Sequence, residues 1–279
     1  MTIPFPVIDA AQHNLIYCIR RTREAGFGGN IMRIHIIACR VFSREISYFA
    51  ALSPHTVDVT WLPQGLHDTP DELRRMLREA IDSVYDQIEK NLLKHRPDYI
   101  VLGYGLCSNG VVGLSSRDIP LVVPRTDDCI ALFLGSQKRY LQLFERMNGT
   151  YWLNNGWIEA SGTLVQQQET QAQRWQKYAE KYGEDNADFL IEQEGSWVAH
   201  YNTCAFIHSD VYESGEFLET AMRVARENNW GFEALQGDAR MIRAMTSGDW
   251  NDEDFLIVHP GQRVAADYSG KKVRSETIV

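Results

Sequence analysis

Three cysteines in this chain of 279 residues stand where they could bind one metal together. Cys39 ends an isoleucine-rich run, Cys107 lies in the glycine-rich stretch GYGLCSNG, and Cys129 follows another apolar run. Thiolate sulfur is a soft ligand that suits zinc or an iron–sulfur cluster. If the three thiols converge, we expect them to hold a metal centre, either a zinc ion or a [4Fe-4S] cluster.

Convergence depends on the elements that carry these cysteines. Apolar runs of strand length alternate with helical patterns from residue 31 onward, which predicts a mostly parallel sheet flanked by helices. The expected strands are 31–39, 57–63, one within 97–107 that is followed there by its loop, and 119–125. The expected helices are 41–52, 69–95 and 127–147. Residues that follow parallel strands share one edge of the sheet, where ligands bind. The sequence therefore predicts a Rossmann-like α/β fold that gathers the three thiols.

The α/β rhythm is interrupted in the middle of the chain. Residues 164–186 are polar and rich in Gln and Glu, which favours a helical insertion. Strands are then expected at 203–209, 231–237 and 254–261, and helices at 213–229 and 238–248. We divide the chain into a lead-in at 1–30, an α/β half at 31–160, a helical insertion at 161–195, and a second α/β half at 196–279.

Each cysteine also has a structural interpretation, because free cysteine is among the most buried residue types. We interpret Cys18 and Cys204 as packing residues. For Cys129, the start of a helix and the nearby Arg125 would lower the thiol pKa. Asp127 and Asp128 oppose that shift; each could cap the helix, orient a ligand, or, for one of them, serve as a fourth ligand.

Other residues are candidates for binding or proton transfer. Arg125 could clamp a carboxylate or phosphate of a substrate, or pair with Asp118, Asp127 or Asp128. Tyr104 and Asn109, in the glycine-rich stretch, are candidate substrate-binding residues. Glu45 and Asp128 are candidate catalytic acids or bases. The aromatic segment 151–157 could wall a pocket.

Composition narrows the class of protein. The net charge of -9 argues against binding nucleic acid or an anionic membrane. No apolar run approaches the roughly 20 residues of a membrane helix, and the first residues lack a secretory signal pattern. Five cysteines without a CxxC pair do not suggest a disulfide framework. We expect a cytoplasmic protein with a small-molecule substrate.

Four sequence blocks carry a family resemblance: IIACRVFSREI, LGYGLCSNGVVGL, PRTDDCIALFLGSQKRY and GTYWLNNGW. Across residues 31–160, and more loosely at DFLIVHPGQ, the chain resembles a bacterial and archaeal family catalogued as a domain of unknown function. Members of that family are frequently encoded beside corrinoid-dependent methyltransferases. The resemblance thus implies a corrinoid methyltransferase system as a partner and a role in one-carbon metabolism.

Three functions fit these observations. The leading hypothesis is a metal-dependent enzyme, a transferase or lyase, in which Cys39, Cys107 and Cys129 leave one coordination position open. Zinc would activate a substrate thiol for methyl transfer, whereas a cluster would act as a Lewis acid on an oxygen-bearing substrate. The alternatives are a non-catalytic accessory protein that binds a corrinoid or a protein partner, and metal-free thiol catalysis through Cys107 or Cys129.

Overall fold

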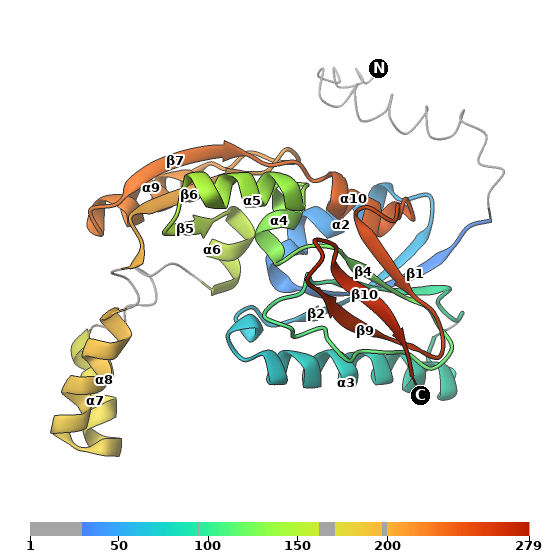
Figure 1. Cartoon of the computed structure of the whole chain (residues 1–279), viewed down its shortest axis with the longest axis horizontal. Coiled ribbons are helices and arrows are strands. Elements are labelled where there is room, and N and C mark those ends of the chain that lie inside the picture. Colours follow the sequence, from blue (N-terminus) through green and yellow to red (C-terminus); the bar gives the residue numbers. More distant parts are fainter. Residues whose placement is uncertain (1–29, 94, 162–170, 197–199, 279) are drawn as a thin grey trace, which may run out of the picture.

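The computed structural model describes residues 30–93, 95–161, 171–196 and 200–278 (Figure 1). The expected lead-in at 1–30, with Cys18, falls outside the described residues except for its last position. So does the start of the polar stretch at 164–186. In the part of the chain that is described, no helix combines the length and the apolar composition needed to cross a membrane.

The larger sheet confirms the expected α/β class. It contains five strands in the order β2-β1-β3-β4-β8. These are β1 (Arg33–Cys39), β2 (Thr56–Leu62), β3 (Tyr99–Gly103), β4 (Leu121–Pro124) and β8 (Phe255–Val258). The first four strands run parallel, and β8 pairs antiparallel with β4. After β1 the chain first adds a strand on one side and later on the other, so the sheet has a topological switch point between β1 and β3.

Helices cover both faces of this sheet (Figure 1). One face packs on α3 (Pro70–Glu89), and the other packs on α2 (Ser43–Leu52), α4 (Cys129–Phe133) and α10 (Arg240–Ser247). Short 3-10 turns precede two of these helices, namely η1 (Arg40–Phe42) and η2 (Leu66–Asp68). Alternate residues of β1 enter the two cores, because successive side chains of a strand point to opposite faces.

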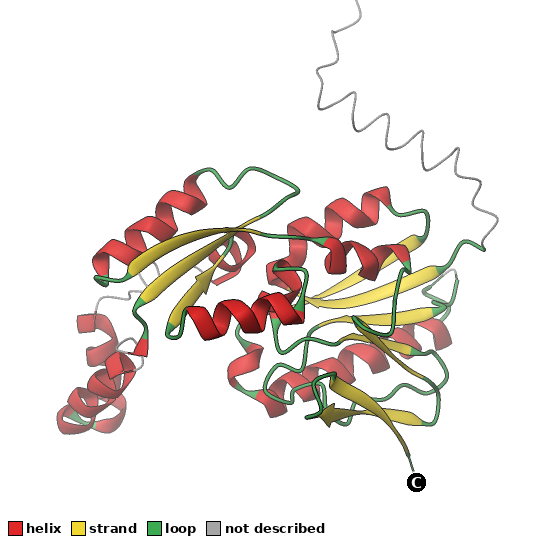
Figure 2. Ribbon diagram, turned by 45° about the horizontal axis from the view of Figure 1, so that its top comes forward, coloured by secondary structure: helices red, strands yellow, loops and turns green. Residues whose placement is uncertain are grey.

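A smaller parallel sheet has the order β5-β6-β7. Its strands are β5 (Thr150–Leu153), β6 (Thr203–His208) and β7 (Gly231–Gln236), and its core includes residues of α6 (Asn155–Ser161) and α9 (Glu216–Glu227). Two further helices, α7 (Gln171–Tyr182) and α8 (Glu184–Ser196), pair with each other and extend away from both sheets (Figure 1). Figure 2 shows the two sheets side by side, with the hairpin of β9 (Gln262–Asp267) and β10 (Lys272–Thr277) beside the larger one.

The two sheets do not follow the expected boundaries at 160 and 196. Strand β5 already belongs to the smaller sheet, while β8 returns to the larger one and covers the edge of β4. Covering an exposed strand edge satisfies its free backbone groups. Helix α10 likewise packs on α2 of the larger sheet. The smaller sheet is therefore formed by a central segment of the chain, with residues of the larger sheet on both sides of it.

The helix expected at 127–147 is two helices, α4 and α5 (Gln137–Arg146). Gly135 has a φ of 70°, and a Cβ at this position would lie 2.5 Å from the carbonyl oxygen of Asp238. Ser136 then caps α5 by accepting a hydrogen bond from the backbone N–H of Arg139. Glycine thus permits both the left-handed backbone at the break and the close approach of the loop after β7. Strand β5 and the hairpin β9–β10 were not predicted.

Helix α3 confirms the apolar stripe expected from the sequence, but it ends at Glu89. Leu73, Leu77 and Val84 are fully buried against the sheet. Asn91 has a left-handed φ of 52°, so the chain leaves the helix before Leu92, which is 70% exposed.

Replacing Leu77 with alanine should lower the free energy of unfolding by about 2–5 kcal/mol, because the change opens a cavity in the core. Leu92→Ala is the matched control and should change it by less than about 0.5 kcal/mol. Urea unfolding followed by circular dichroism measures both values. Equal losses in the two variants would contradict the packing of α3.

Candidate metal centre at the switch point

Cys39, Cys107 and Cys129 line one cavity, as the sequence predicts for thiols at the carboxyl ends of neighbouring parallel strands. The cavity has a volume of about 750 Å³. Its walls come from the ends of β1 and β3, the start of α4 and the segment 63–68 on one side, and from β5 and α6 of the smaller sheet on the other. The cavity therefore opens where ligands bind in open α/β sheets.

The pairing of β1 with β3 places the first two thiols. Ala38 and Gly103 are directly opposite each other in the parallel register. A Cβ on Gly103 would lie 2.6 Å from the Cβ of Ala38, so only glycine fits this approach. The segments that carry Cys39 and Cys107 thus leave the sheet side by side at the switch point.

The loop after β3 has an uncommon backbone conformation. Cys107, Ser108 and Asn109 have positive φ values of 44°, 54° and 67°. Such values are uncommon for residues other than glycine, and they tend to occur at functional sites. The backbone N–H groups of Leu106 and Cys107 donate to the carbonyl oxygens of Thr126 and Asp127, both at 2.8 Å. These bonds hold Cys107 beside the segment that leads to Cys129.

Asp128 fixes the start of α4, whose first residue is Cys129. One carboxylate oxygen accepts from the backbone N–H groups of Ile130 and Ala131, at 2.9 and 3.4 Å. The other accepts from the hydroxyl of Tyr140 at 3.1 Å. Burial raises the pKa of Asp128 above its usual value, against the opposing effect of these hydrogen bonds.

The thiols resist ionisation in this cavity. Burial raises the pKa of Cys129 well above its usual value, and the charges of Asp128 and the other two cysteines raise it further. The pKa of Cys107 rises for the same reasons, with burial and Asp128 as the main causes. Burial also raises the pKa of Cys39, although nearby backbone groups and the Tyr104 hydroxyl oppose this.

The lowered pKa expected for Cys129 is therefore not found. Helix α4 spans only 5 residues, so its dipole is small. Arg125 is buried and points elsewhere: its guanidinium donates to the carbonyl oxygens of Phe255 and Val273 and pairs with Asp252. It does not pair with Asp118, Asp127 or Asp128 as the sequence suggested. β8 and the β9–β10 hairpin supply the two carbonyl partners, so Arg125 links the end of β4 to both of these elements.

The remaining candidates divide between the cavity and other places. Tyr104 and Asp128 line the cavity. The Tyr104 hydroxyl is buried without a well-formed hydrogen bond, although it lies near enough to Cys39 to influence its pKa. Asn109 does not line the cavity; its carbonyl oxygen accepts from Arg74 at 2.9 Å. Glu45 lines a different cavity.

His67 and Tyr201 line the cavity and were not singled out in the sequence. His67, from η2, lies against Trp157 with ring centroids 5.5 Å apart, and Tyr201 precedes β6. The aromatic segment 151–157 does wall the cavity, through Tyr151, Trp152 and Trp157. Only its pattern of aromatic residues signalled this wall, since β5 is a strand of 4 residues.

The three cysteines line the same cavity, but their sulfur atoms are not arranged as a complete metal site. Within the described ranges, no three side chains of His, Cys, Asp or Glu are arranged closely enough to hold a metal ion. Metal ligation by cysteine requires loss of the thiol proton. A bound metal would therefore have to draw these protonated thiols together as it displaces their protons.

Comparison with known proteins gives the family. The family described as "Protein of unknown function (DUF1638)" matches residues 61–246. The chain belongs to the DUF1638 family. The matched region of this family member includes Cys107, Cys129 and all of the smaller sheet, whereas Cys39 precedes it. No curated protein and no solved structure matches the chain.

The raised thiol pKa values predict slow alkylation of metal-free protein. At pH 7.5, iodoacetamide should label Cys107 and Cys129 at least about tenfold more slowly in the folded than in the unfolded chain, because only thiolate reacts. Asp128→Asn retains the capping oxygen but removes the charge, so both rates should increase. Asp118→Asn, at the surface, is the control. Peptide mass spectrometry gives the rates, and rapid labelling of the folded wild type would contradict the electrostatics.

Proposed function

We propose that Cys39, Cys107 and Cys129 bind one metal centre, and that the chain is a metal-dependent enzyme acting on a small molecule. The observation that carries this proposal is the presence of the three thiols in one cavity at the switch point. Cys204, the second residue of β6, does not line this cavity. It is fully buried in the core of the smaller sheet.

Electrostatics favour a metal over unassisted thiol catalysis. Cys107 and Cys129 have raised pKa values, so very little thiolate exists at neutral pH. Of the cavity-lining residues that the structure describes, none is a lysine or arginine that could stabilise a thiolate. A metal cation bound to the sulfur atoms would stabilise the thiolate form, because a coordinating thiol is deprotonated outright.

The size of the cavity supports binding of a small-molecule substrate. Its volume of about 750 Å³ lies in the range of ligand pockets, roughly 300–1,000 Å³. Three protein ligands are typical of catalytic metal sites, which keep one position open. Near the thiols, Asp128 has the raised pKa of a candidate proton donor, and Tyr104 offers a buried hydroxyl.

Two metal chemistries fit this donor set. Zinc would hold a substrate thiol as thiolate for methyl transfer, and a [4Fe-4S] cluster would expose one iron as a Lewis acid. We further propose that the larger sheet works as a Rossmann-like unit, that α7 and α8 are an insertion, and that a corrinoid methyltransferase system is the partner.

The alternative function is that of a non-catalytic accessory protein that binds a corrinoid or this partner. It is favoured by the lack of a complete metal site among the described side chains.

Metal analysis of anaerobically prepared protein tests the proposal. The wild type should contain about one zinc, or about four iron with acid-labile sulfide and a brown colour. Cys39→Ser, Cys107→Ser and Cys129→Ser should each lose most of the metal, while Cys204→Ser retains it.

Circular dichroism melts should show that all four variants are folded, so that metal loss reports ligation. Equal metal content in wild type and Cys39→Ser would overturn the assignment of Cys39. A folded, metal-free wild type that still captures its partner would favour the accessory function.

A further inference from the structure

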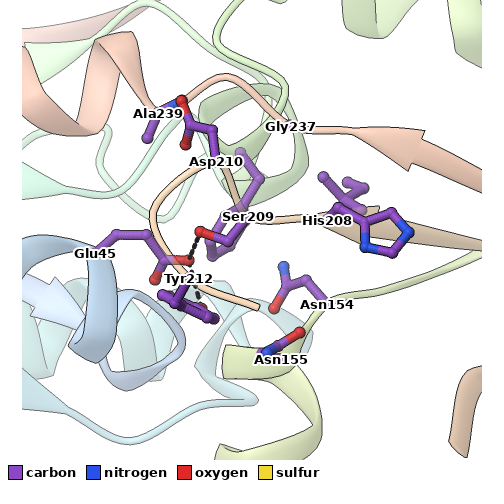
Figure 3. A pocket seen from close by; sticks show the side chains of 11 residues that line it. Glu45, Asn154, Asn155, His208, Ser209, Asp210, Tyr212, Gly237 and Ala239 are labelled. Carbon is purple, nitrogen blue, oxygen red and sulfur yellow. Dashed lines mark hydrogen bonds between the residues drawn. The ribbon is translucent and has the colours of Figure 1, made fainter. Parts of the chain in front are cut away.

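A second, smaller cavity lies between the two sheets at the carboxyl ends of β5, β6 and β7 (Figure 3). Its volume is about 10 Å³, enough for one guest the size of a water molecule. Residues after β5 and β6 form most of its polar lining, and Glu45 of α2 enters from the larger sheet.

Two side chains in this cavity have polar atoms without partners. Glu45 is 2% exposed; its Oε1 accepts from the hydroxyls of Tyr212 at 2.6 Å and Ser209 at 3.2 Å (Figure 3), whereas Oε2 has no partner. Asn155 is 1% exposed, and neither Oδ1 nor Nδ2 has a partner. Buried polar atoms without hydrogen bonds are costly. A guest in the cavity would relieve that cost.

The charge of the lining selects the kind of guest. Glu45, Asp210 and His208 line the cavity, and no lysine or arginine is among the described residues that line it. The neighbouring Arg44 pairs with Glu159, and its guanidinium carbon lies 5.2 Å from the ring centroid of Tyr212. It forms no ion pair with Glu45, although its charge lowers the pKa of Glu45 against the larger effect of burial. A buried carboxylate normally has a paired cation or binds a metal ion. The lining oxygens thus favour a cation over a neutral guest.

The walls of the cavity are fixed by tight packing. A Cβ on Gly156 would lie only 1.8 Å from the carbonyl oxygen of Val41, so the start of α6 is pressed against η1 of the larger sheet. A guest bound by Glu45 and Asn155 would therefore join an element of each sheet, in a space too small for a polyatomic organic ligand.

We propose that this cavity binds one potassium-sized monovalent cation, K⁺ or NH₄⁺, through Oε2 of Glu45 and Oδ1 of Asn155. The site is separate from the thiol cavity and does not depend on its function. The competing occupant is a single water molecule beside a protonated Glu45. Burial raises the pKa of Glu45, so water is the outcome against which the cation must be tested.

Thermal unfolding of the full chain in different chloride salts of equal ionic strength separates the two occupants. Wild type should unfold about 3 °C higher in KCl or NH₄Cl than in choline chloride, since a ligand bound only by the folded state stabilises it. Glu45→Gln keeps the size of the side chain but should lose this difference. Glu145→Gln, which changes an exposed residue of α5 away from this cavity, is the control and should keep it.

A direct measurement completes the test. Crystals grown with RbCl should show one anomalous peak beside Glu45 Oε2 and Asn155 Oδ1 in wild type, and none in Glu45→Gln. Equal melting temperatures in all salts, or an ordered water at this position in place of rubidium, would overturn the proposal. Cys39→Ser should keep the potassium response, so failure of the metal centre and failure of this site are distinguishable.

Discussion

The parallel pairing of β1 with β3 determines where the thiol cavity lies. The chain goes from β1 to β2 on one side and later to β3 on the other, so the connections that start at these two adjacent strand ends separate and leave a crevice between them. Gly103 allows the two strands to meet at Ala38 without a clash. The backbone bonds from Leu106 and Cys107 to the segment after β4 then bring the third cysteine to the same crevice.

Both cavities present the same electrostatic problem. The thiol cavity contains Asp128 and three cysteines, and the smaller cavity contains Glu45 and Asp210. Neither cavity has a lysine or arginine among its described lining residues. Acidic groups in such places either remain protonated or bind a cation. Burial raises the pKa of Asp128 and of Glu45, which favours the protonated form of each carboxyl group. The proposed metal centre and the proposed monovalent cation are the two corresponding ways to stabilise the charged state.

Local sequence patterns predicted the strands of the larger sheet and helix α3, because a buried strand and an amphipathic helix each show a recognisable pattern in consecutive residues. Convergence of the thiols followed from the common direction of the strands. Features set by distant contacts could not be predicted in this way. Gly135, where the expected helix is interrupted, lies against Asp238 far along the chain. Strand β8 pairs with β4, although the residues of the smaller sheet lie between them in the sequence. Arg125 found its partners on β8 and the C-terminal hairpin, whereas Glu45 reached the smaller sheet through residues far along the chain.

X-ray absorption spectroscopy of the metal in anaerobically purified protein tests whether Cys39, Cys107 and Cys129 are its ligands. We expect a first shell dominated by sulfur; for zinc it contains three sulfur scatterers at about 2.3 Å and one lighter atom. For a cluster, the iron spectrum adds a short iron–iron distance. A shell of only nitrogen and oxygen atoms would contradict the account, because the cysteines at the switch point would then not be the ligands.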